Sequence, residues 1–340
     1  MSKTERPGVY TSYEISGSLY GGSAGAAVGL AAAGLGSGDG DIITLGSIME
    51  AQEAFGGGNI VELAKILLEN GAPKIYAAEV FDEDYEAAFK ALMNCADVRF
   101  MVCDSHDGDV HAAMKDTILA GDEQGKYRIG IVETDLDTRA ELVEAAKALG
   151  SERMAMVSHH EAEGIPGAVA AAVCGAAASG DDPALPLNGA ELAGLGNIGG
   201  NFSDADVTLL ILGGVTPIET VYGSRSIIRG VTTRTTTAGV DDPTWREINT
   251  IMIIDHMMPA MRDSLRRRFA RAKNTAQTRG AIRTQVLVEL EEYLRREIID
   301  SYSDITVSQS AEDPTVCVVN FAFTVAHGLN KIQLRAHITV

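Results

Sequence analysis

The chain has 340 residues, 46% of them hydrophobic, which is enough to bury one large core or two domains and excludes a disordered or membrane-embedded protein. Its 47 Asp and Glu outnumber 28 Lys and Arg, giving a formal net charge of −19. Residues 221–340 hold 16 of the basic and 13 of the acidic side chains, so this part carries +3 and the remainder −22. An acidic body with a mildly basic C-terminal third argues against nucleic acid as a partner and fits a basic face that meets an acidic protein surface.

Targeting and redox features are few. Residues 1–7 contain no apolar stretch, so we expect no signal peptide. The Ala/Gly-rich runs at 24–35 and 164–179 are too short and too weakly apolar to span a bilayer, so we expect no direct membrane insertion. The cysteines form no C-x-x-C pair, which favours buried free thiols in a reducing compartment. They are Cys95, Cys103, Cys174 and Cys317.

The N-terminal segment from Arg6 to Ile15 is extended, β-prone and too short to fold alone. Its candidate strand residues are Val9, Tyr10, Tyr13 and Ile15. Residues 21–25, Gly-Gly-Ser-Ala-Gly, match the G-x-S-x-G nucleophile pattern, but 16–20 make a poor strand and no His stands in a partner context. We interpret this stretch as a flexible hinge between an arm and the body.

Strands and helices alternate over residues 42–220, which predicts a mainly parallel sheet covered by helices. The predicted strands are 42–45, 74–80, 98–104, 128–133, 153–158 and 207–212. The helix ends show capping signals. We predict N-caps at Asn59 (with Glu62), Asp82 and Asp137, and helix stops at Gly71 and Gly150.

Two glycine-rich loops could be mistaken for cofactor sites. Residues 194–199 match G-x-G-x-x-G, but they neither follow a clear strand nor open a helix, as the dinucleotide fingerprint requires. In residues 34–41, Asp39 and Asp41 would repel phosphate. We expect no cofactor.

Histidines occur in two clusters, at 106–111 and at 159–160. Neither has the H-E-x-x-H spacing that places two metal ligands on one helical face. We interpret them as loop residues at the C-terminal ends of strands and expect no metal.

After residue 220 the pattern changes. A β-rich stretch, 227–237, precedes long helical patterns at 242–274 and 278–301, and Pro259 is expected to kink or divide the first. Met257, Met261, Leu265 and Phe269 share a helix face. Further strands are predicted near 305–308, 315–325 and 331–340.

Basic residues cluster on the first long helix. They are Arg262, Arg266, Arg267, Arg268, Arg271 and Lys273, opposed only by Asp263. The alternative is an ordinary solvated helix face. We favour a docking role, although Arg279, Arg283, Arg295 and Arg296 on the next helix compete for it.

The last ten residues alternate without error, which predicts a strand with one buried face. The apolar positions are Ile332, Leu334, Ala336, Ile338 and Val340. Two strand-like termini on one chain suggest polymerisation by strand exchange. The predicted domains are an N-terminal extended arm (1–22), an α/β outer domain (23–220), an α+β inner domain (221–327) and a C-terminal strand arm (328–340).

Several stretches resemble the contractile tail sheath proteins that surround the tubes of contractile bacteriophages and R-type bacteriocins. They are residues 6–10 (RPGVY), 54–56 with 69–76, 186–189 (PLNG), 214–219, 229–235 (RGVTTRT) and the order of helices and strands from Trp245 to Val340. The Gly/Ala-rich segment 21–40 departs from the family pattern and leaves the start of the α/β domain uncertain.

The resemblance implies a structural subunit rather than an enzyme. In such proteins the inner domain faces the tail tube, and the arms add strands to neighbouring subunits while the sheath contracts. The implied partners are other copies of the chain in stacked six-fold rings, the tube protein, and baseplate and tail-terminator proteins. Assembly would take place in the bacterial cytoplasm. The alternatives are an α/β hydrolase or nucleotide-binding enzyme using Ser23 or residues 194–199, and a non-contractile filament or shell subunit.

Overall fold

The computed structural model describes residues 26–36, 40–159, 164–196 and 201–331, together with Gln333 and Arg335. The described residues fall into two units. The first, which we call the α/β unit, takes its residues from Ser23–Asp181, Leu185–Ile251 and Gly328–Val340. The second, which we call the helix–hairpin unit, comprises Asp182–Ala184 and Met252–His327.

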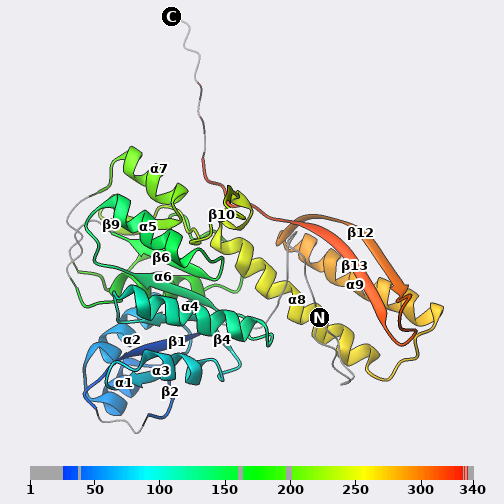
Figure 1. Cartoon of the computed structure of the whole chain (residues 1–340), viewed down its shortest axis with the longest axis horizontal. Coiled ribbons are helices and arrows are strands. Elements are labelled where there is room, and N and C mark those ends of the chain that lie inside the picture. Colours follow the sequence, from blue (N-terminus) through cyan, green and yellow to red (C-terminus); the bar gives the residue numbers. More distant parts are fainter. Residues whose placement is uncertain are drawn as a thin grey trace, which may run out of the picture. The chain divides into compact units, whose positions relative to one another are not determined.

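The α/β unit is built on a nine-stranded sheet in the order β2-β3-β1-β4-β5-β6-β8-β9-β7 (Figure 1). The six strands from β3 to β8 are parallel, while β2, β9 and β7 are antiparallel at the two edges. The mainly parallel sheet predicted from the sequence is therefore confirmed. The strands are β1 (Ala27–Ala33), β2 (Ile43–Leu45), β3 (Ile75–Val80), β4 (Val98–Cys103), β5 (Ile129–Glu133), β6 (Met154–Ser158), β7 (Glu191–Leu192), β8 (Val215–Val221) and β9 (Ser224–Ile227).

Helices cover both faces of this sheet. They are α1 (Ile48–Phe55), α2 (Asn59–Glu69), α3 (Tyr85–Leu92), α4 (Gly108–Asp122), α5 (Arg139–Leu149), α6 (Ala168–Ala178) and α7 (Asp204–Leu212). Helices α2 and α6 pack together on one face, and α3, α4 and α5 follow one another on the other. Helix α6 is apolar all round and buried along nearly its whole length, as expected of a helix enclosed by the core.

The Gly/Ala-rich segment that the sequence left uncertain contains the central strand β1. Its first six residues are buried, between β3 and β4. A Cβ atom at Gly29 would lie 3.3 Å from a methyl group of Val98, so a larger side chain would crowd the neighbouring strand. A strand covered on both faces loses the polar–apolar alternation that makes strands visible in a sequence.

One predicted strand, residues 207–212, is wrong, since these residues end helix α7. Ser203 and Asp206 form a capping box, in which each side chain accepts a hydrogen bond from the other residue's backbone N–H. A six-residue apolar run fits a buried strand or a helix turn equally well, and here the cap decides for the helix. The strand follows the helix as β8.

Three predicted N-caps are also wrong by one or two residues. Helix α2 has Gly58 as its N-cap, α3 has Asp84, and α5 has Thr138 in a capping box with Glu141. The helix stops are confirmed, because Gly150 is the left-handed C-cap of α5 and Gly71 adopts a positive φ directly after the C-cap of α2.

A connecting stretch carries a short hairpin, β10 (Thr236–Thr237) and β11 (Val240–Asp241), and a 3₁₀ turn at Pro243–Trp245. Helix α8 (Ile248–Phe269) then starts in the α/β unit and continues into the helix–hairpin unit. Pro259 lies inside α8 and does not divide it.

The helix–hairpin unit continues with α9 (Ala276–Arg295), β12 (Ile299–Gln309) and β13 (Cys317–Val325). The second predicted helix, 278–301, is too long at its C-terminal end, because Glu297 has a positive φ and β12 begins at Ile299. The predicted helix face is confirmed at Met257 and Met261, which are buried in the core of this unit.

Candidate assembly surfaces

The hairpin of β12 and β13 is a two-stranded sheet with two open edges. Within the described residues no third strand pairs with either β12 or β13. The two strands pair from Ile299 with Val325 to Gln309 with Cys317, so the open edge is eleven residues long on β12 and nine on β13. Unpaired backbone N–H and C=O groups along such an edge are a ready template for another strand.

Only one face of this hairpin is covered by its own unit. Along β13 the residues alternate strictly between half-buried and exposed positions. Phe321 and Phe323 stack with ring centroids 6.2 Å apart and pack against the core formed by α8 and α9. The opposite face of β13 presents Val318, Asn320, Ala322 and Thr324, so it carries no charged side chain of the kind that usually protects an edge.

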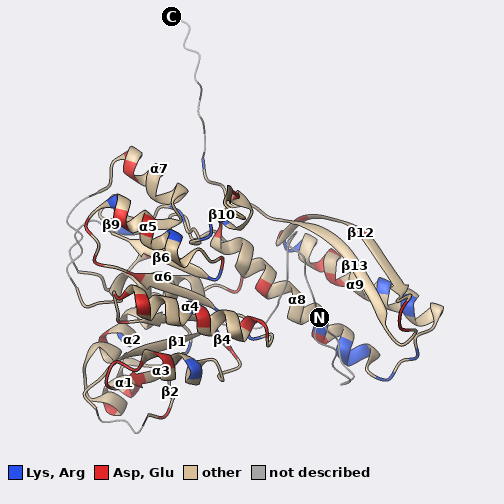
Figure 2. Cartoon of the chain, in the orientation of Figure 1, with Lys and Arg blue, Asp and Glu red and all other residues tan. Residues whose placement is uncertain are grey.

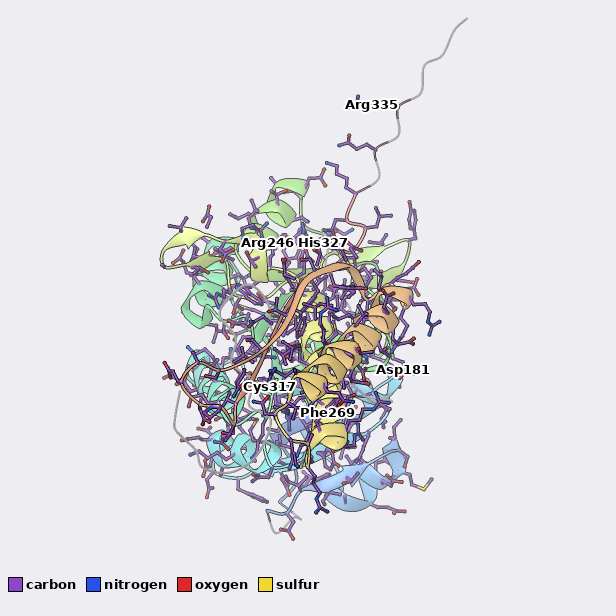
Figure 3. The ribbon with its side chains drawn as sticks, turned by 90° about the vertical axis from the view of Figure 1, so that its right-hand side faces the viewer. Asp181, Arg246, Phe269, Cys317, His327 and Arg335 are labelled. Atoms are coloured by element: carbon purple, nitrogen blue, oxygen red, sulfur yellow. The ribbon has the colours of Figure 1, made fainter. Side chains whose placement is uncertain are left out.

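The basic cluster predicted from the sequence lies at the C-terminal end of α8 and in the segment after it (Figure 2). Arg266, Arg267 and Arg268 are exposed, and so are Arg271 and Lys273. Figure 3 marks Phe269 at the end of this helix. Arg262 is only half-exposed, and burial lowers the pKa of its guanidinium. It is the least accessible member of the cluster.

Three of the four competing arginines on and beside α9 are engaged within their own unit, whereas Arg296 is exposed. Arg279 donates to Asn274 Oδ1 at 2.9 Å, and Arg283 donates to the backbone carbonyl of Ile305 at 3.2 Å. Arg295 forms an ion pair with Glu292 at 2.6 Å.

The α8 cluster differs in this respect. Arg267 only donates to the carbonyl of Asp263 in its own helix, at 3.3 Å. The other four exposed members form no ion pair or hydrogen bond with any residue that the structure describes; they are Arg266, Arg268, Arg271 and Lys273. Positive charge available to a partner is therefore concentrated at the end of α8.

The predicted arm residues lie almost entirely outside the described residues. This holds for Val9, Tyr10, Tyr13, Ile15, Ile332, Leu334, Ala336, Ile338 and Val340. The described residues of this C-terminal segment are Lys331, Gln333 and Arg335. They are exposed and are assigned to no strand.

Two of the histidines predicted to be loop residues lie at the C-terminal ends of sheet strands, with His106 after β4 and His159 after β6, but the prediction is wrong for His111, which lies in helix α4. His106 and His159 line a cavity of about 490 Å³ together with Glu133. His111 is buried within α4, where its Nε2 lies 2.8 Å from the carbonyl of Ser105 and burial lowers its pKa. His160 lies outside the described residues. In the described part of the chain, no three His, Cys, Asp or Glu side chains are grouped so that they could hold a metal ion.

Glu133, at the end of β5, is buried and contacts both the N-terminus of α6 and the loop after β4. Its carboxylate accepts from the backbone N–H of Gly167 at 2.6 Å and of Ala170 at 2.9 Å, at the N-terminus of α6. Its Oε1 also lies 3.1 Å from His106 Nε2, and this contact raises the pKa of His106. The sequence pattern did not single out Glu133, although its position as the last residue of a strand was the available signal.

The crevice between β1 and β4, where the strand order of such sheets reverses and ligands commonly bind, is filled by the protein itself. The buried carboxylate of Asp104 accepts from Tyr85 Oη at 2.7 Å, from Asn59 Nδ2 at 2.9 Å and from the Ala33 N–H at 2.9 Å. Sequence reasoning missed this network as well, since its members come from four separate elements.

Of the two enzyme-like motifs, only the first part of residues 194–199 is described, and its surroundings do not fit a dinucleotide site. Ser23 and the rest of residues 21–25 lie outside the described residues. Gly194 follows β7, a two-residue antiparallel edge strand, and a Cβ there would lie 2.4 Å from the Glu69 carboxylate. The next helix, α7, has Asp204 and Asp206 in its first turn, which would repel a phosphate.

The thiols are free, as predicted, but only Cys103 and Cys174 are buried, while Cys95 and Cys317 are half-exposed. Burial raises the pKa of Cys103 to about 12. None of the helices in the described part of the chain combines the length and apolar character that a bilayer-spanning segment needs.

Comparison with known proteins places these surfaces in context. The sequence model of the phage tail sheath C-terminal domain matches residues 240–339. A search of curated proteins finds no significant match.

Solved structures match over nearly the whole chain. One is a chain of the anti-feeding prophage baseplate, with a TM-score of 0.74, 15% identity and coverage of 99% of this chain and 100% of that one. The contracted helical sheath of the same prophage has a TM-score of 0.73 at 15% identity, covering 98% and 99%. A sheath tail protein from Desulfitobacterium hafniense has a TM-score of 0.70 at 11% identity, covering 94% and 100%.

These findings confirm the fold class, α/β with a large mostly parallel sheet and C-terminal antiparallel strands. They also confirm the resemblance to contractile tail sheath proteins. The chain has the fold of a tail sheath protein, and its residues 240–339 match the family's C-terminal domain.

Proposed function

We propose that this chain is the structural subunit of a contractile tail sheath, which polymerises helically around a tail tube and contracts to drive the tube through a target cell envelope. The observation that carries the proposal is the hairpin of β12 and β13. It lies within the matched sheath domain, and both its edges lack a partner strand among the described residues. A sheet left open in this way needs strands from elsewhere, and the alternating C-terminal segment has the pattern of such a strand.

The strength of strand exchange follows from the number of backbone hydrogen bonds. An added strand forms about five of them at ~0.5–1.5 kcal/mol each, or about 5 kcal/mol before ordering costs. Copies joined head to tail through different surfaces form open helical assemblies. The arms would then hold the subunits together while other contacts change.

The basic end of α8 is the proposed contact with the tube. Exposed ion pairs contribute only ~0.2–1 kcal/mol each, so the five exposed members of the cluster would add about 3 kcal/mol per subunit at the middle of that range, against about 5 kcal/mol for the added strand. This contact is weaker than an added strand and is the first to break. Contraction is then a switch between two packings of the same subunits, with the extended packing metastable.

The remaining partners follow from this role. The similarity to a baseplate chain and to a contracted sheath of the anti-feeding prophage supports contacts with other copies of the chain and with a baseplate. A tail terminator, stacked six-fold rings and assembly in a bacterial cytoplasm complete the proposal.

Removing residues 330–340 tests strand exchange. We expect a soluble, folded protein that forms no tubes in negative-stain electron microscopy, because the donor strand is gone while the cores of both units remain. Sheath-like polymers from the truncated chain would overturn the proposal that the C-terminal arm joins subunits.

Charge reversal tests the tube contact. Changing Arg266, Arg267 and Arg268 to Glu should weaken assembly around purified tubes but spare self-assembly into contracted-type polymers. The matched control reverses Arg279, Arg283 and Arg295, which already have partners in their own unit. Equal loss of tube-templated assembly in both triple variants would show that the end of α8 is not the contact surface.

A further inference from the structure

The start of the C-terminal arm is attached to the α/β unit. The last backbone bond of the helix–hairpin unit runs from Ala326 N–H to the carbonyl of Ile298, at 3.2 Å. Residues 328–331 belong to the α/β unit, where Gly328 and Asn330 meet residues 186–188. His327 and Arg335, labelled in Figure 3, lie on either side of this segment. We call residues 328–331 the arm root.

Asn188 contacts the arm root with one end of its amide and the core of the unit with the other. Its Oδ1 accepts from the N–H of Gly230 at 3.2 Å, and its Nδ2 donates to Asn330 Oδ1 at 2.5 Å. A backbone N–H can only donate, so the bond from Gly230 fixes which end of the amide faces Asn330.

Gly328 fits closely against Pro186. A Cβ atom at Gly328 would lie 2.8 Å from Cγ and 3.0 Å from Cβ of Pro186, closer than real Cβ atoms approach a ring. The arm root is therefore located by two contacts, one through its backbone at Gly328 and one through the side chain of Asn330.

The platform under the arm root is held firmly. Gly189 N–H donates to the carbonyl of Ile227 at 2.7 Å, and Ile227 N–H returns a bond to Ala190 at 3.0 Å. Leu187 is buried, and a Cβ at Gly230 would lie 3.1 Å from its Cβ. Residues 186–190 thus have little freedom to move with the arm.

We infer that residues 186–188 anchor the root of the C-terminal arm, with Asn188 as the positioning residue that fixes the point at which the arm leaves the α/β unit. The inference deepens the proposed function, on which its role in assembly rests. Without the anchor, the chain between Val325 and the arm would be a free tether. Fixing the root reduces the conformational freedom that is lost when the arm pairs with a neighbouring sheet, which is the general effect of preorganisation.

The anchor is testable in the full-length monomer through trypsin cleavage after Lys331, which is exposed and adjacent to Asn330. Asn330→Ala removes the acceptor, whereas Asn330→Asp keeps an oxygen that accepts from Asn188. Cleavage tracks the fraction of molecules in which the root is detached. Since a hydrogen bond contributes ~1 kcal/mol, we expect cleavage about fivefold faster in Asn330→Ala. We expect the wild-type rate in Asn330→Asp.

Cleavage after Arg335, further along the arm, is the internal reference and should change in neither variant. Equal rates at Lys331 in the wild type and Asn330→Ala would overturn the anchor. So would equal acceleration in both variants, since the effect would then not depend on the hydrogen bond.

Assembly provides the second measurement. The concentration at which tubes appear should rise about fivefold in Asn330→Ala, by the same ~1 kcal/mol, and return to the wild-type value in Asn330→Asp. An unchanged concentration in Asn330→Ala would overturn the role of the anchor in assembly. If the wild type forms no tubes while the trypsin result holds, the proposed function fails and the anchor stands.

Discussion

The nine-stranded sheet and the β12–β13 hairpin differ in how completely their strands are paired and covered. In the α/β unit, β1 is buried at six of its seven positions and lies between two paired strands, and β4 is almost as fully enclosed. In the helix–hairpin unit, β13 alternates between half-buried and exposed residues and pairs only with β12 among the described strands. The central strands of the first sheet pair on both sides, whereas each strand of the hairpin leaves one row of backbone groups open to another chain.

This difference indicates a division of labour. A sheet covered on both faces is stabilised by the apolar area that it buries, and its stability does not depend on added strands. An open two-stranded hairpin buries less apolar area in its own unit, so pairing with a partner strand adds relatively more to its stability. Substitutions in the first sheet should therefore unfold the monomer, whereas substitutions in the hairpin should mainly affect the local stability on which assembly depends.

The largest effect is expected for Gly167→Ala at the N-terminus of α6. Gly167 has a φ of +83°, and a Cβ there would lie 2.3 Å from the carbonyl oxygen of Cys103. Because that neighbour is backbone, relief requires moving the end of β4 or α6, and we expect a loss of about 3 kcal/mol in unfolding free energy. Trp245, the single tryptophan and a buried residue of the α/β unit, reports the transition by fluorescence during urea unfolding.

The control is Gly108→Ala at the start of α4, where nothing lies within 4 Å of the added methyl group. It should leave the unfolding free energy unchanged or raise it by up to about 1 kcal/mol, because alanine restricts the freedom of the unfolded chain. Similar losses in both variants would mean that α6 is not held against β4 as tightly as the contact at Cys103 indicates.

A smaller and local effect is expected for Phe323→Ala in the hairpin. Fully buried Phe→Ala substitutions cost 3–5 kcal/mol, and this half-buried ring should cost about 2 kcal/mol. Hydrogen exchange of the β12 and β13 amides should accelerate, while the unfolding curve of Trp245 stays the same. The neighbouring Ala322→Ser, on the exposed face, should leave both measurements unchanged; a shift of the Trp245 curve in Phe323→Ala would show that the two units do not unfold separately.

The same contrast explains what the sequence could predict. Continuous apolar runs between turn signals located β3, β4, β5 and β6 within a residue of their true ends. The sequence did not reveal strand β1 because Gly and Ala are weak strand formers, and the close approach of Val98 explains the glycine at position 29. Residues 207–212 were misassigned because one cap, not the apolar run, decides their structure.

The site residues divide in a similar way. The basic cluster of α8 was visible as a run of like charge, but which of two helices offers free charge depends on partners such as Asn274 and Ile305 that come from other parts of the fold. Glu133 and Asp104 each join three or more elements, and no local spacing encodes such a meeting. Open strand edges are likewise a property of the assembled sheet.

The smallest effect concerns pH and the contact between His106 and Glu133 in the α/β unit. The buried carboxylate raises the pKa of His106 above its ordinary value of 6.5, with a lesser contribution from Asp135. The folded protein therefore binds this proton more tightly than the unfolded chain does. The resulting stabilisation is complete below pH 6.5 and is lost as the pH rises through the folded pKa. His111 acts in the opposite direction, because burial lowers its pKa and its contribution is lost as the pH falls.

Variants separate the two histidines. His106→Gln should reduce the unfolding free energy by about 1 kcal/mol at about pH 6, the difference between a charge-assisted and a neutral hydrogen bond, and by less at about pH 8.5. His111→Gln should show no such decline of its effect with rising pH. Both are measured from Trp245 fluorescence in urea. A His106→Gln loss that is independent of pH would mean that the His106 ring holds the β4–α4 loop by packing alone. The charge of His106 would then contribute nothing to the unfolding free energy of the α/β unit.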